Sequence, residues 1–189
     1  MSKVVQDIWL NGVTKVISEH CDERDDAFLS SNAIDLLVIH NISLPPAEGE
    51  QDFDNDNVEA FFSGQLQANA HPYFEQIADL RVSAHLYIKR TGEVVQFVPL
   101  NKRAWHAGVS EFKGRTKCND FSIGIEMQGT DYMPYTEAQY QALVAVTKEI
   151  RHLFVNIKID NIVGHQDIAP GRKTDPGQYF DWTKYKSQL

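Results

Sequence analysis

The stretch AIDLLVIHN, residues 33–41, decides the fold class of this sequence. It is a nearly continuous apolar run with several β-branched side chains, and it gives way abruptly to His40 and Asn41. Such a run is typical of a strand that is buried on both faces near the middle of a sheet. We therefore predict a central strand here, closed by His40.

Further strands are predicted on either side of residue 100. Residues 83–89 and 93–100 are two strand candidates joined by Arg90-Thr91-Gly92, and the glycine in this connection indicates a hairpin. Residues 121–126 alternate, which predicts one face formed by Phe121, Ile123 and Ile125 and another by Ser122, Gly124 and Glu126. Residues 162–165, IVGH, predict a short strand that ends in His165.

One helix is marked clearly by its start signal. Thr136-Glu137-Ala138-Gln139 is a capping-box signature, and apolar residues follow it at helical spacing as far as Phe154. Strands interleaved with a helix indicate an α/β (α+β) class with a central mixed β-sheet flanked by helices. The 189 residues favour a single domain, residues 1–189.

Composition excludes several classes of protein. No apolar run approaches the roughly 18 residues of a membrane span, and the N-terminus has no apolar segment of a secretion signal. Only Cys21 and Cys118 are present, so no disulfide framework is expected, and a cytoplasmic location is the simplest prediction. The net charge of −8 argues against a nucleic-acid partner.

The charge is distributed unevenly along the chain. Residues 1–59 contain 13 acidic and 3 basic side chains, and residues 45–59 are predicted to form a turn-rich, solvated surface loop. Residues 60–189 contain 13 acidic and 15 basic side chains. Four basic clusters in this part could hold an anionic small molecule, or they could be solvated surface charge: 89–90, 102–103, 113–117 and 172–173.

Polar residues that follow apolar strands are the candidates for chemistry, since nucleophile-elbow, P-loop, dinucleotide-binding and HExxH motifs are all missing. His40 and His165 each close a predicted strand, where α/β sheets usually place ligands. Together with Asp175 they could form a catalytic zinc site of two imidazoles and one carboxylate. The alternative from spacing alone is two hydrogen-bonded structural histidines and an aspartate that starts a turn.

Two further residues could complete such a site. Glu126 lies beside Gly124, which has no side chain, so a substrate could approach this carboxylate and use it as a general base. Lys173 is two residues before Asp175 and could stabilise the oxyanion of a tetrahedral intermediate. The alternatives are a glutamate on an exposed sheet face and an ordinary surface lysine.

These segments together resemble the zinc-dependent N-acetylmuramoyl-L-alanine amidases, and within them the cytoplasmic 1,6-anhydro-N-acetylmuramyl-L-alanine amidases. The resemblance spans nearly the whole chain, and six segments carry it: LLVIHNISLPP (36–46), HPYF (71–74), 80–110, CNDFSIGIEMQGTD (118–131), YTEAQYQAL (135–143) and GHQDIAPGRKTDPG (164–177). It implies a peptidoglycan-recognition-like fold with a catalytic core at about 30–180, and one zinc ion held by His40, His165 and Asp175. It also implies that Glu126 is the catalytic base and Lys173 the transition-state stabiliser.

The resemblance implies hydrolysis of the amide between the lactyl group of a muramic acid and L-alanine, in cytoplasmic recycling of anhydro-muropeptides that influences β-lactamase induction. A monomer without membrane contacts is expected. Candidate substrate contacts in the matching segments are Asn41, Tyr73, Arg81, His106 and Lys117. Two alternatives stay open: an exported cell-wall amidase and a non-catalytic peptidoglycan-recognition module.

Overall fold

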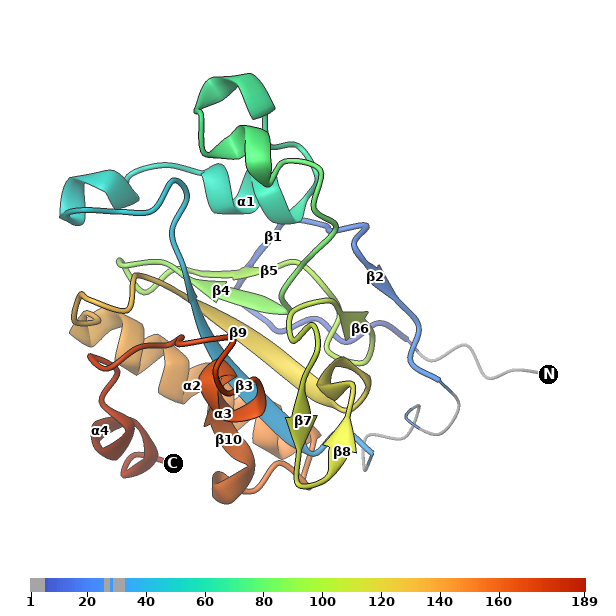
Figure 1. The fold of residues 1–189 in the computed structure, drawn as a ribbon. Coiled ribbons are helices and arrows are strands. Elements are labelled where there is room, and N and C mark those ends of the chain that lie inside the picture. The colour runs from blue at the N-terminus through green and yellow to red at the C-terminus, as the bar shows by residue number, and fades with distance from the viewer. Residues whose placement is uncertain (1–5, 26–27, 29–32) are drawn as a thin grey trace.

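The computed structural model describes residues 6–25, 28 and 33–189. The first five residues, part of the N-terminal stretch for which we predict no secretion signal, lie outside this range. In the described residues a six-stranded sheet forms the centre of the fold, with strand order β1-β5-β4-β9-β3-β10 (Figure 1). Its strands are β1 (Thr14–Lys15), β3 (Leu36–Ile42), β4 (Leu86–Ile88), β5 (Val94–Gln96), β9 (Ser122–Gln128) and β10 (Ile162–Gly164).

The sheet is mixed, as the sequence predicts. β3 runs parallel to both β9 and β10, β9 runs parallel to β4, and β4 pairs antiparallel with β5. The β4–β5 pair confirms the predicted hairpin, although each strand has only three residues, and Gly92 in its turn has a φ of +86°. Because a side chain strains that backbone conformation, glycine suits this turn.

β3 is the predicted buried strand, but it does not end at His40. It continues to Ile42, because Asn41 and Ile42 pair with Met127 and Gln128 of β9. His40 is therefore a strand residue, paired with Glu126, and its position is fixed by backbone pairing on one side rather than by a loop.

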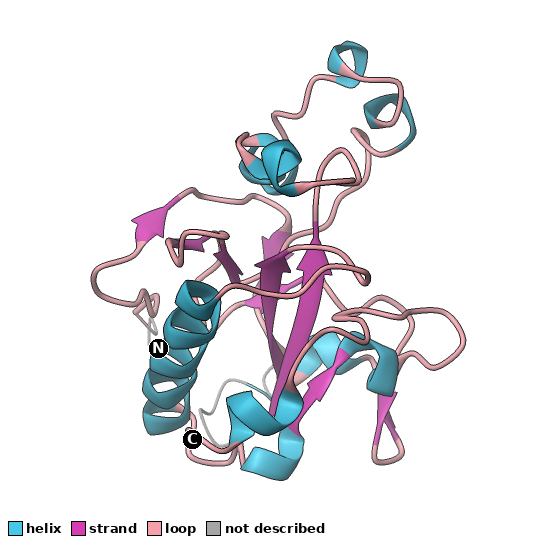
Figure 2. Cartoon of the chain, turned by 90° about the vertical axis from the view of Figure 1, so that its left-hand side faces the viewer, coloured by secondary structure: helices cyan, strands magenta, loops and turns pink. Residues whose placement is uncertain are grey.

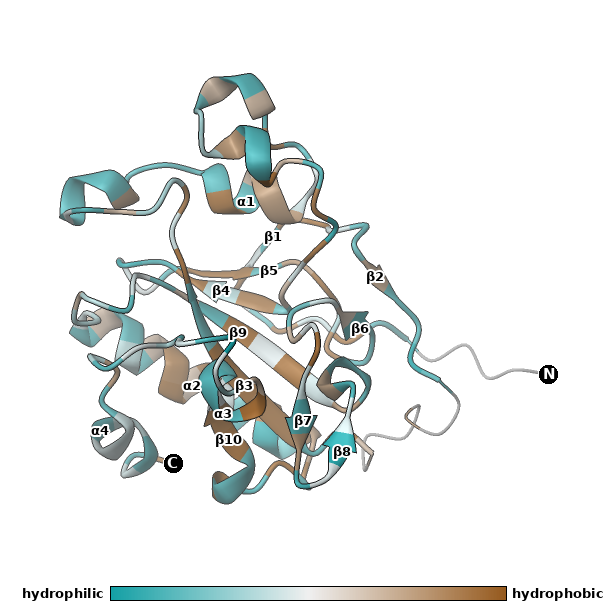
Figure 3. Cartoon of the chain, viewed as in Figure 1, coloured by the Kyte–Doolittle hydropathy of each residue, from teal (hydrophilic) through white to brown (hydrophobic). Residues whose placement is uncertain are grey.

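Helix α2 (Glu137–Leu153) covers one face of the sheet (Figure 2). Thr136 caps it with the predicted capping box, and its buried face packs on alternate residues of β3 and β9, among them Leu37, Ile39, Ile123 and Ile125. Figure 3 shows how hydrophobic residues concentrate in these central strands. Burial of this surface stabilises the fold at about 25 cal/mol for each Å² removed from water.

Phe121 is an exception to the predicted alternation. It ends the short helix η5 (Cys118–Asp120) with a φ of −129° and a ψ of 14°, so it precedes the extended chain of β9. Its ring packs with Leu36 and Val38 on the face opposite to α2. The period-two pattern applies only from Ser122 onward.

The acidic segment 45–59 is more ordered than a solvated loop. It contains η2 (Glu50–Phe53) and the start of α1 (Asn57–Phe62), with Phe53 and Val58 buried. Its acidic side chains form ion pairs with two basic residues of the β4–β5 connection. Glu50 pairs with Arg90, and Asp56 and Glu59 pair with Lys89. The basic pair 89–90 is therefore matched by this segment.

Short elements complete the chain. They are β2 (Cys21–Asp22), η3 (Ala68–Ala70), η4 (Phe74–Gln76), β6 (Arg103–Ala104), β7 (Glu111–Phe112), β8 (Arg115–Thr116), η6 (Ile159–Asn161), α3 (His165–Ile168) and α4 (Trp182–Lys186). Cys21 and Cys118 are both free. Within the described part of the chain, none of the helices has the length and apolar character needed to cross a membrane.

The capping box of α2 makes a stability prediction. The Thr136 hydroxyl accepts a hydrogen bond from the Gln139 backbone N–H at 3.1 Å and donates one to the Arg90 carbonyl at 2.7 Å. We expect Thr136→Ala to lower the free energy of unfolding by about 1–2 kcal/mol, measured by urea denaturation. Thr136→Ser keeps the hydroxyl and should stay close to the parent, and unchanged stability of Thr136→Ala would contradict this role.

Candidate metal centre and active-site cavity

Parallel pairing brings three candidate residues to one edge of the sheet. His40 of β3 and Glu126 of β9 are register partners, and His165 follows β10 directly. The carboxyl ends of parallel strands meet at the same edge, where α/β sheets bind their ligands. His165 differs from the prediction only in its element, because it begins the short helix α3 instead of closing the strand.

Asp175 reaches the same edge on the loop that follows α3. The Gln166 backbone N–H donates to the Asp175 carbonyl at 3.0 Å, which holds the loop against the start of α3. The loop also packs on Gly164, where an added Cβ would lie only 2.8 Å from the Pro176 ring. A glycine is thus required at residue 164 for the close approach of this loop.

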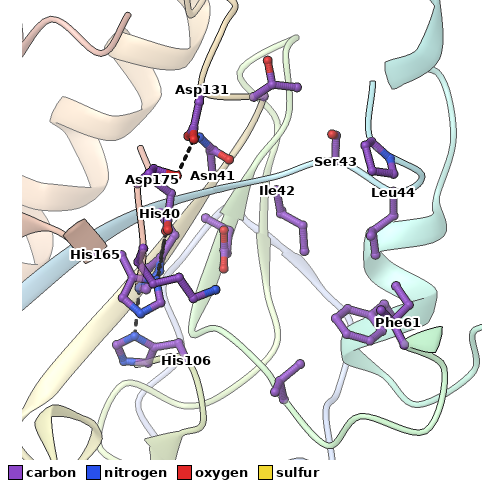
Figure 4. A pocket seen from close by; sticks show the side chains of 18 of the residues that line it. His40, Asn41, Ile42, Ser43, Leu44, Phe61, His106, Asp131, His165 and Asp175 are labelled. Atoms are coloured by element: carbon purple, nitrogen blue, oxygen red, sulfur yellow. Dashed lines mark hydrogen bonds and ion pairs between the residues drawn. The ribbon is translucent and has the colours of Figure 1, made fainter. Parts of the chain in front are cut away.

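The three candidate ligands face one point, as Figure 4 shows. The Nδ1 atoms of His40 and His165 are 2.9 Å apart, and Asp175 Oδ2 lies 3.1 Å from the first and 3.0 Å from the second. His40 and His165 are 1% and 3% exposed, so bulk water does not separate these atoms.

This triangle fits a metal ion better than it fits a hydrogen-bond network. His165 Nε2 lies 3.1 Å from the Ala107 carbonyl, which only accepts, so in a neutral ring Nε2 carries the proton and Nδ1 a lone pair. The lone pair of His165 Nδ1 and the Asp175 oxygen repel each other at 3.0 Å, and a cation between them removes this repulsion. Tetrahedral zinc with bonds of roughly 2.0–2.1 Å places its ligand atoms about 3.3 Å apart.

The electrostatics favour the protonation states that bind metals. Burial disfavours the charged imidazolium and lowers the pKa of His40 to about 4. Burial by itself raises the pKa of the Asp175 carboxyl, but the facing rings of His165 and His40 outweigh it and hold that pKa well below its usual range. A neutral histidine and an ionised aspartate are the forms that ligate a metal.

Glu126 is a buried carboxyl beside this group. Burial and, to a lesser degree, the Asp175 charge raise its pKa well above the ordinary value, while Lys173 acts in the opposite direction. Its Oε2 atom is buried and has no hydrogen-bond partner among the described residues. Glu126 is therefore not the solvent-exposed glutamate of the alternative reading. An unpaired, basic carboxylate in this place is suited to proton transfer.

These residues open into a cavity of about 610 Å³, a size typical of small-molecule sites. His40, Glu126, His165, Lys173 and Asp175 all line it. The opposite wall is apolar and comes mainly from α1 and the segment after it: Leu44, Phe61, Phe62, Ile77, Leu80 and Val82.

The structure divides the five candidate substrate contacts. Asn41, Tyr73 and His106 line the cavity, whereas Arg81 and Lys117 are exposed and do not. Of the four basic clusters, only 172–173 lies in the lining. Clusters 89–90 and 102–103 are in ion pairs, and in 113–117 Arg115 pairs with Asp35. The contacts themselves stay predictions.

The sequence did not predict a role for two residues of this region. Asp131 accepts a hydrogen bond from the Asn41 side chain at 2.8 Å and another from the Thr174 hydroxyl, and so ties β3 to the loop of Asp175. Asn119 binds the backbone of His106 and Ala107. Neither role has a local sequence signal, because each joins segments that are far apart in the chain.

Comparison with known proteins places this geometry in a family. The family model described as N-acetylmuramoyl-L-alanine amidase matches residues 30–178. The chain belongs to the N-acetylmuramoyl-L-alanine amidase family. The family membership that we expected from the sequence is thereby confirmed.

Individual relatives agree with this assignment. The chain is 53% identical over 178 residues to the 1,6-anhydro-N-acetylmuramyl-L-alanine amidase AmpD of Escherichia coli K12, covering 94% of this chain and 92% of AmpD. A crystal structure of a selenomethionine derivative of AmpD superposes with a TM-score of 0.89 at 50% identity, covering 99% of both chains. The predicted fold class is confirmed.

A more distant amidase has been solved with a substrate. The complex of the E. coli amidase AmiD with anhydro-N-acetylmuramic acid-L-Ala-D-γ-Glu-L-Lys superposes with a TM-score of 0.63 at 29% identity. It covers 90% of this chain and 66% of AmiD.

A buried histidine behind the site makes a pH prediction. His85 Nδ1 accepts from the Gly124 N–H and Nε2 donates to the Lys102 carbonyl, each at 3.0 Å, while burial and then the Arg24 charge lower its pKa to about 3. In the unfolded chain His85 has a pKa near 6.5, so it takes up a proton between pH 7 and pH 5, whereas in the folded chain it stays neutral. The free energy of unfolding therefore falls as the pH falls through this range.

His85→Gln keeps a donor for the Lys102 carbonyl but cannot be protonated in this pH range. From pH 7 to pH 5, we expect the free energy of unfolding to fall by about 2 kcal/mol less in His85→Gln than in the parent. Urea denaturation of the metal-free proteins measures this difference. His152→Gln, at an exposed position of α2, is the matched control and should leave the difference at zero. Equal pH dependence of His85→Gln and the parent would contradict the prediction.

Proposed function

We propose that this protein is a zinc-dependent amidase that hydrolyses the bond between the lactyl group of a 1,6-anhydro-N-acetylmuramyl peptide and its L-alanine. The observation that carries the proposal is the convergence of His40, His165 and Asp175 beside the buried Glu126 in one cavity. The 53% identity to AmpD supports the anhydro-muropeptide as substrate.

Zinc is the metal that this ligand set fits best. Two neutral imidazoles and one carboxylate are typical of catalytic zinc, which keeps a fourth position open. When bound, zinc polarises a carbonyl as a Lewis acid and acidifies water near neutral pH. His40, His165 and Asp175 would hold one ion, and strand β3, the start of helix α3 and the loop after α3 keep these three ligands in place.

Glu126 acts as the general base in this proposal. Its carboxylate takes a proton from the attacking water and then delivers it to the nitrogen of the leaving L-alanine. Burial supports this role, because a carboxylate with a raised pKa is a stronger base than an exposed one. Its unpaired Oε2 atom is available for the water.

Lys173 supplies a positive charge near the reacting carbonyl. Its side chain lines the cavity next to Glu126 and His40, and its charge acts on both of their pKa values. An ammonium group there stabilises the negative charge that develops on the carbonyl oxygen. The long flexible side chain lets Lys173 reach the substrate without a rigid partner.

The cavity walls suit a sugar joined to a peptide. The apolar wall from α1 can contact the faces of a sugar ring, and the polar residues Asn41, Asp131 and Lys173 on the other side can bind peptide groups. We propose Asn41, Tyr73 and His106 as substrate contacts. Arg81 and Lys117 remain proposals for peptide carboxylates that extend beyond the cavity.

We further propose that residues 1–189 act as one monomeric domain, with the catalytic core at about 30–180, in cytoplasmic peptidoglycan recycling. Hydrolysis there would lower the amount of anhydro-muropeptide that induces β-lactamase. Similarity to AmpD supports this setting over an exported cell-wall amidase. The intact set of ligands and base favours hydrolysis over a non-catalytic recognition module.

The function is tested by incubating the purified protein with anhydro-muramyl tripeptide, with and without a chelator. We expect release of free tripeptide that stops in the chelator and returns when zinc is added back. Intact peptidoglycan is the parallel substrate and should be cleaved more slowly. Undiminished release by metal-free protein would contradict the zinc mechanism, and faster cleavage of intact wall would favour the exported alternative.

Removal of the base gives a second test. Glu126→Gln should reduce kcat for the tripeptide substrate by roughly a hundred- to ten-thousand-fold and leave one zinc ion bound, because it removes proton transfer without touching a ligand. Glu137→Gln, a surface glutamate paired with Lys184, is the matched control and should keep full activity. A kcat of Glu126→Gln near that of the parent would exclude the proposed base.

A further inference from the structure

Two consecutive residues support both candidate zinc-ligand histidines from behind. The ring of His106 places Nδ1 2.9 Å from His40 Nε2, and the carbonyl of Ala107 lies 3.1 Å from His165 Nε2. These are the nitrogens that point away from Asp175. The segment 106–107 therefore faces the outer side of both imidazoles at once, as Figure 4 shows for His106.

This support selects one tautomer of each ring. The Ala107 carbonyl accepts only, so it keeps the proton of His165 on Nε2. His106 Nε2 lies 3.1 Å from the Ser122 hydroxyl, and when it donates there, His106 Nδ1 accepts the proton on His40 Nε2. In this arrangement both ligand Nδ1 atoms carry lone pairs, as metal binding requires.

One side chain binds the backbone N–H groups of both residues of segment 106–107. Asn119 Oδ1 accepts hydrogen bonds from the backbone N–H groups of His106, at 3.2 Å, and Ala107, at 2.8 Å. Asn119 is itself anchored, because its backbone carbonyl accepts a hydrogen bond at 2.8 Å from the buried Arg24. Asn119 does not line the cavity and does not belong to the ligand group.

Strand β9 leaves just enough room for the ring of His106. An added Cβ on Gly124 of β9 would lie 2.5 Å from two atoms of this ring, a distance that no real contact allows. The backbone of Gly124 is extended strand, so this close approach, and not its conformation, is what calls for glycine. The ring is confined between β9 and His40.

We propose that Asn119 is a positioning residue of the zinc site, which fixes the orientation and tautomer of His40 and His165 through His106 and Ala107. The inference rests on the proposed zinc-dependent function and adds to it a residue outside the cavity. Loss of partners in the outer shell of a metal site typically weakens metal affinity by roughly 10- to 100-fold. Asn119 acts on both ligands, so its loss should fall in this range.

The test measures the zinc dissociation constant by competition with a chromophoric chelator, for the full-length parent and three variants. Asn119→Ala removes the acceptor, and we expect zinc binding that is about ten-fold weaker or more. Asn119→Asp keeps an acceptor oxygen and should restore affinity close to that of the parent. Asn101→Ala removes an asparagine Oδ1 that accepts from the Ile8 N–H, away from the cavity lining, and should bind zinc as the parent does.

Each outcome has a definite meaning. Weak binding by Asn119→Ala, rescue by Asn119→Asp and parent-like binding by Asn101→Ala together support the inference, since the effect then follows the acceptor oxygen at residue 119 and not the loss of any asparagine acceptor. Parent-like affinity of Asn119→Ala overturns the inference and leaves the proposed function intact. A parent protein that binds no zinc overturns the proposed function, and the inference falls with it.

A second variant covers the case in which Asn119→Ala does not fold. Gly124→Ala leaves Asn119 in place but displaces the His106 ring, so it should also weaken zinc binding by about ten-fold. Circular dichroism of the metal-free form checks that the fold is kept. Parent-like affinity of a folded Gly124→Ala would contradict control of the site through the His106 ring.

Discussion

The site depends on the close approach of three groups that could ligate one metal ion. Two imidazole Nδ1 atoms and one carboxylate oxygen lie within about 3 Å of one another in a buried place. β3 carries His40, and more than 120 residues later α3 and the loop after it carry His165 and Asp175, so the tertiary fold brings these groups together.

The sheet provides the rigidity for this task. β3 and β9 pair over seven residues, and α2 covers one face with an apolar core, so the other face can carry His40 and Glu126 in fixed register. Glycines at 124 and 164 let the His106 ring and the Asp175 loop approach the strands closely. The same register places Glu126, the proposed base, next to His40, a proposed metal ligand, which links the fold to the proposed amide hydrolysis.

Local patterns predicted the parts of the fold that have local causes. The apolar run of β3, the glycine turn of the hairpin and the capping box of α2 each depend on neighbouring residues, and each is confirmed. The family motifs pointed to His40, Glu126, His165, Lys173 and Asp175, which the structure brings to one cavity. The end of β3, the order in segment 45–59, the ion pairs of the basic clusters and the role of Asn119 depend on contacts between distant residues, so no local pattern could reveal them.

The central claim is that His40, His165 and Asp175 bind one cation between them. Anomalous diffraction at the zinc absorption edge, from crystals of the zinc-loaded protein, tests it most directly. We expect one strong peak at about 2.0–2.2 Å from both Nδ1 atoms and from a carboxylate oxygen of Asp175. A peak at other residues, or none between these three side chains, would contradict the claim.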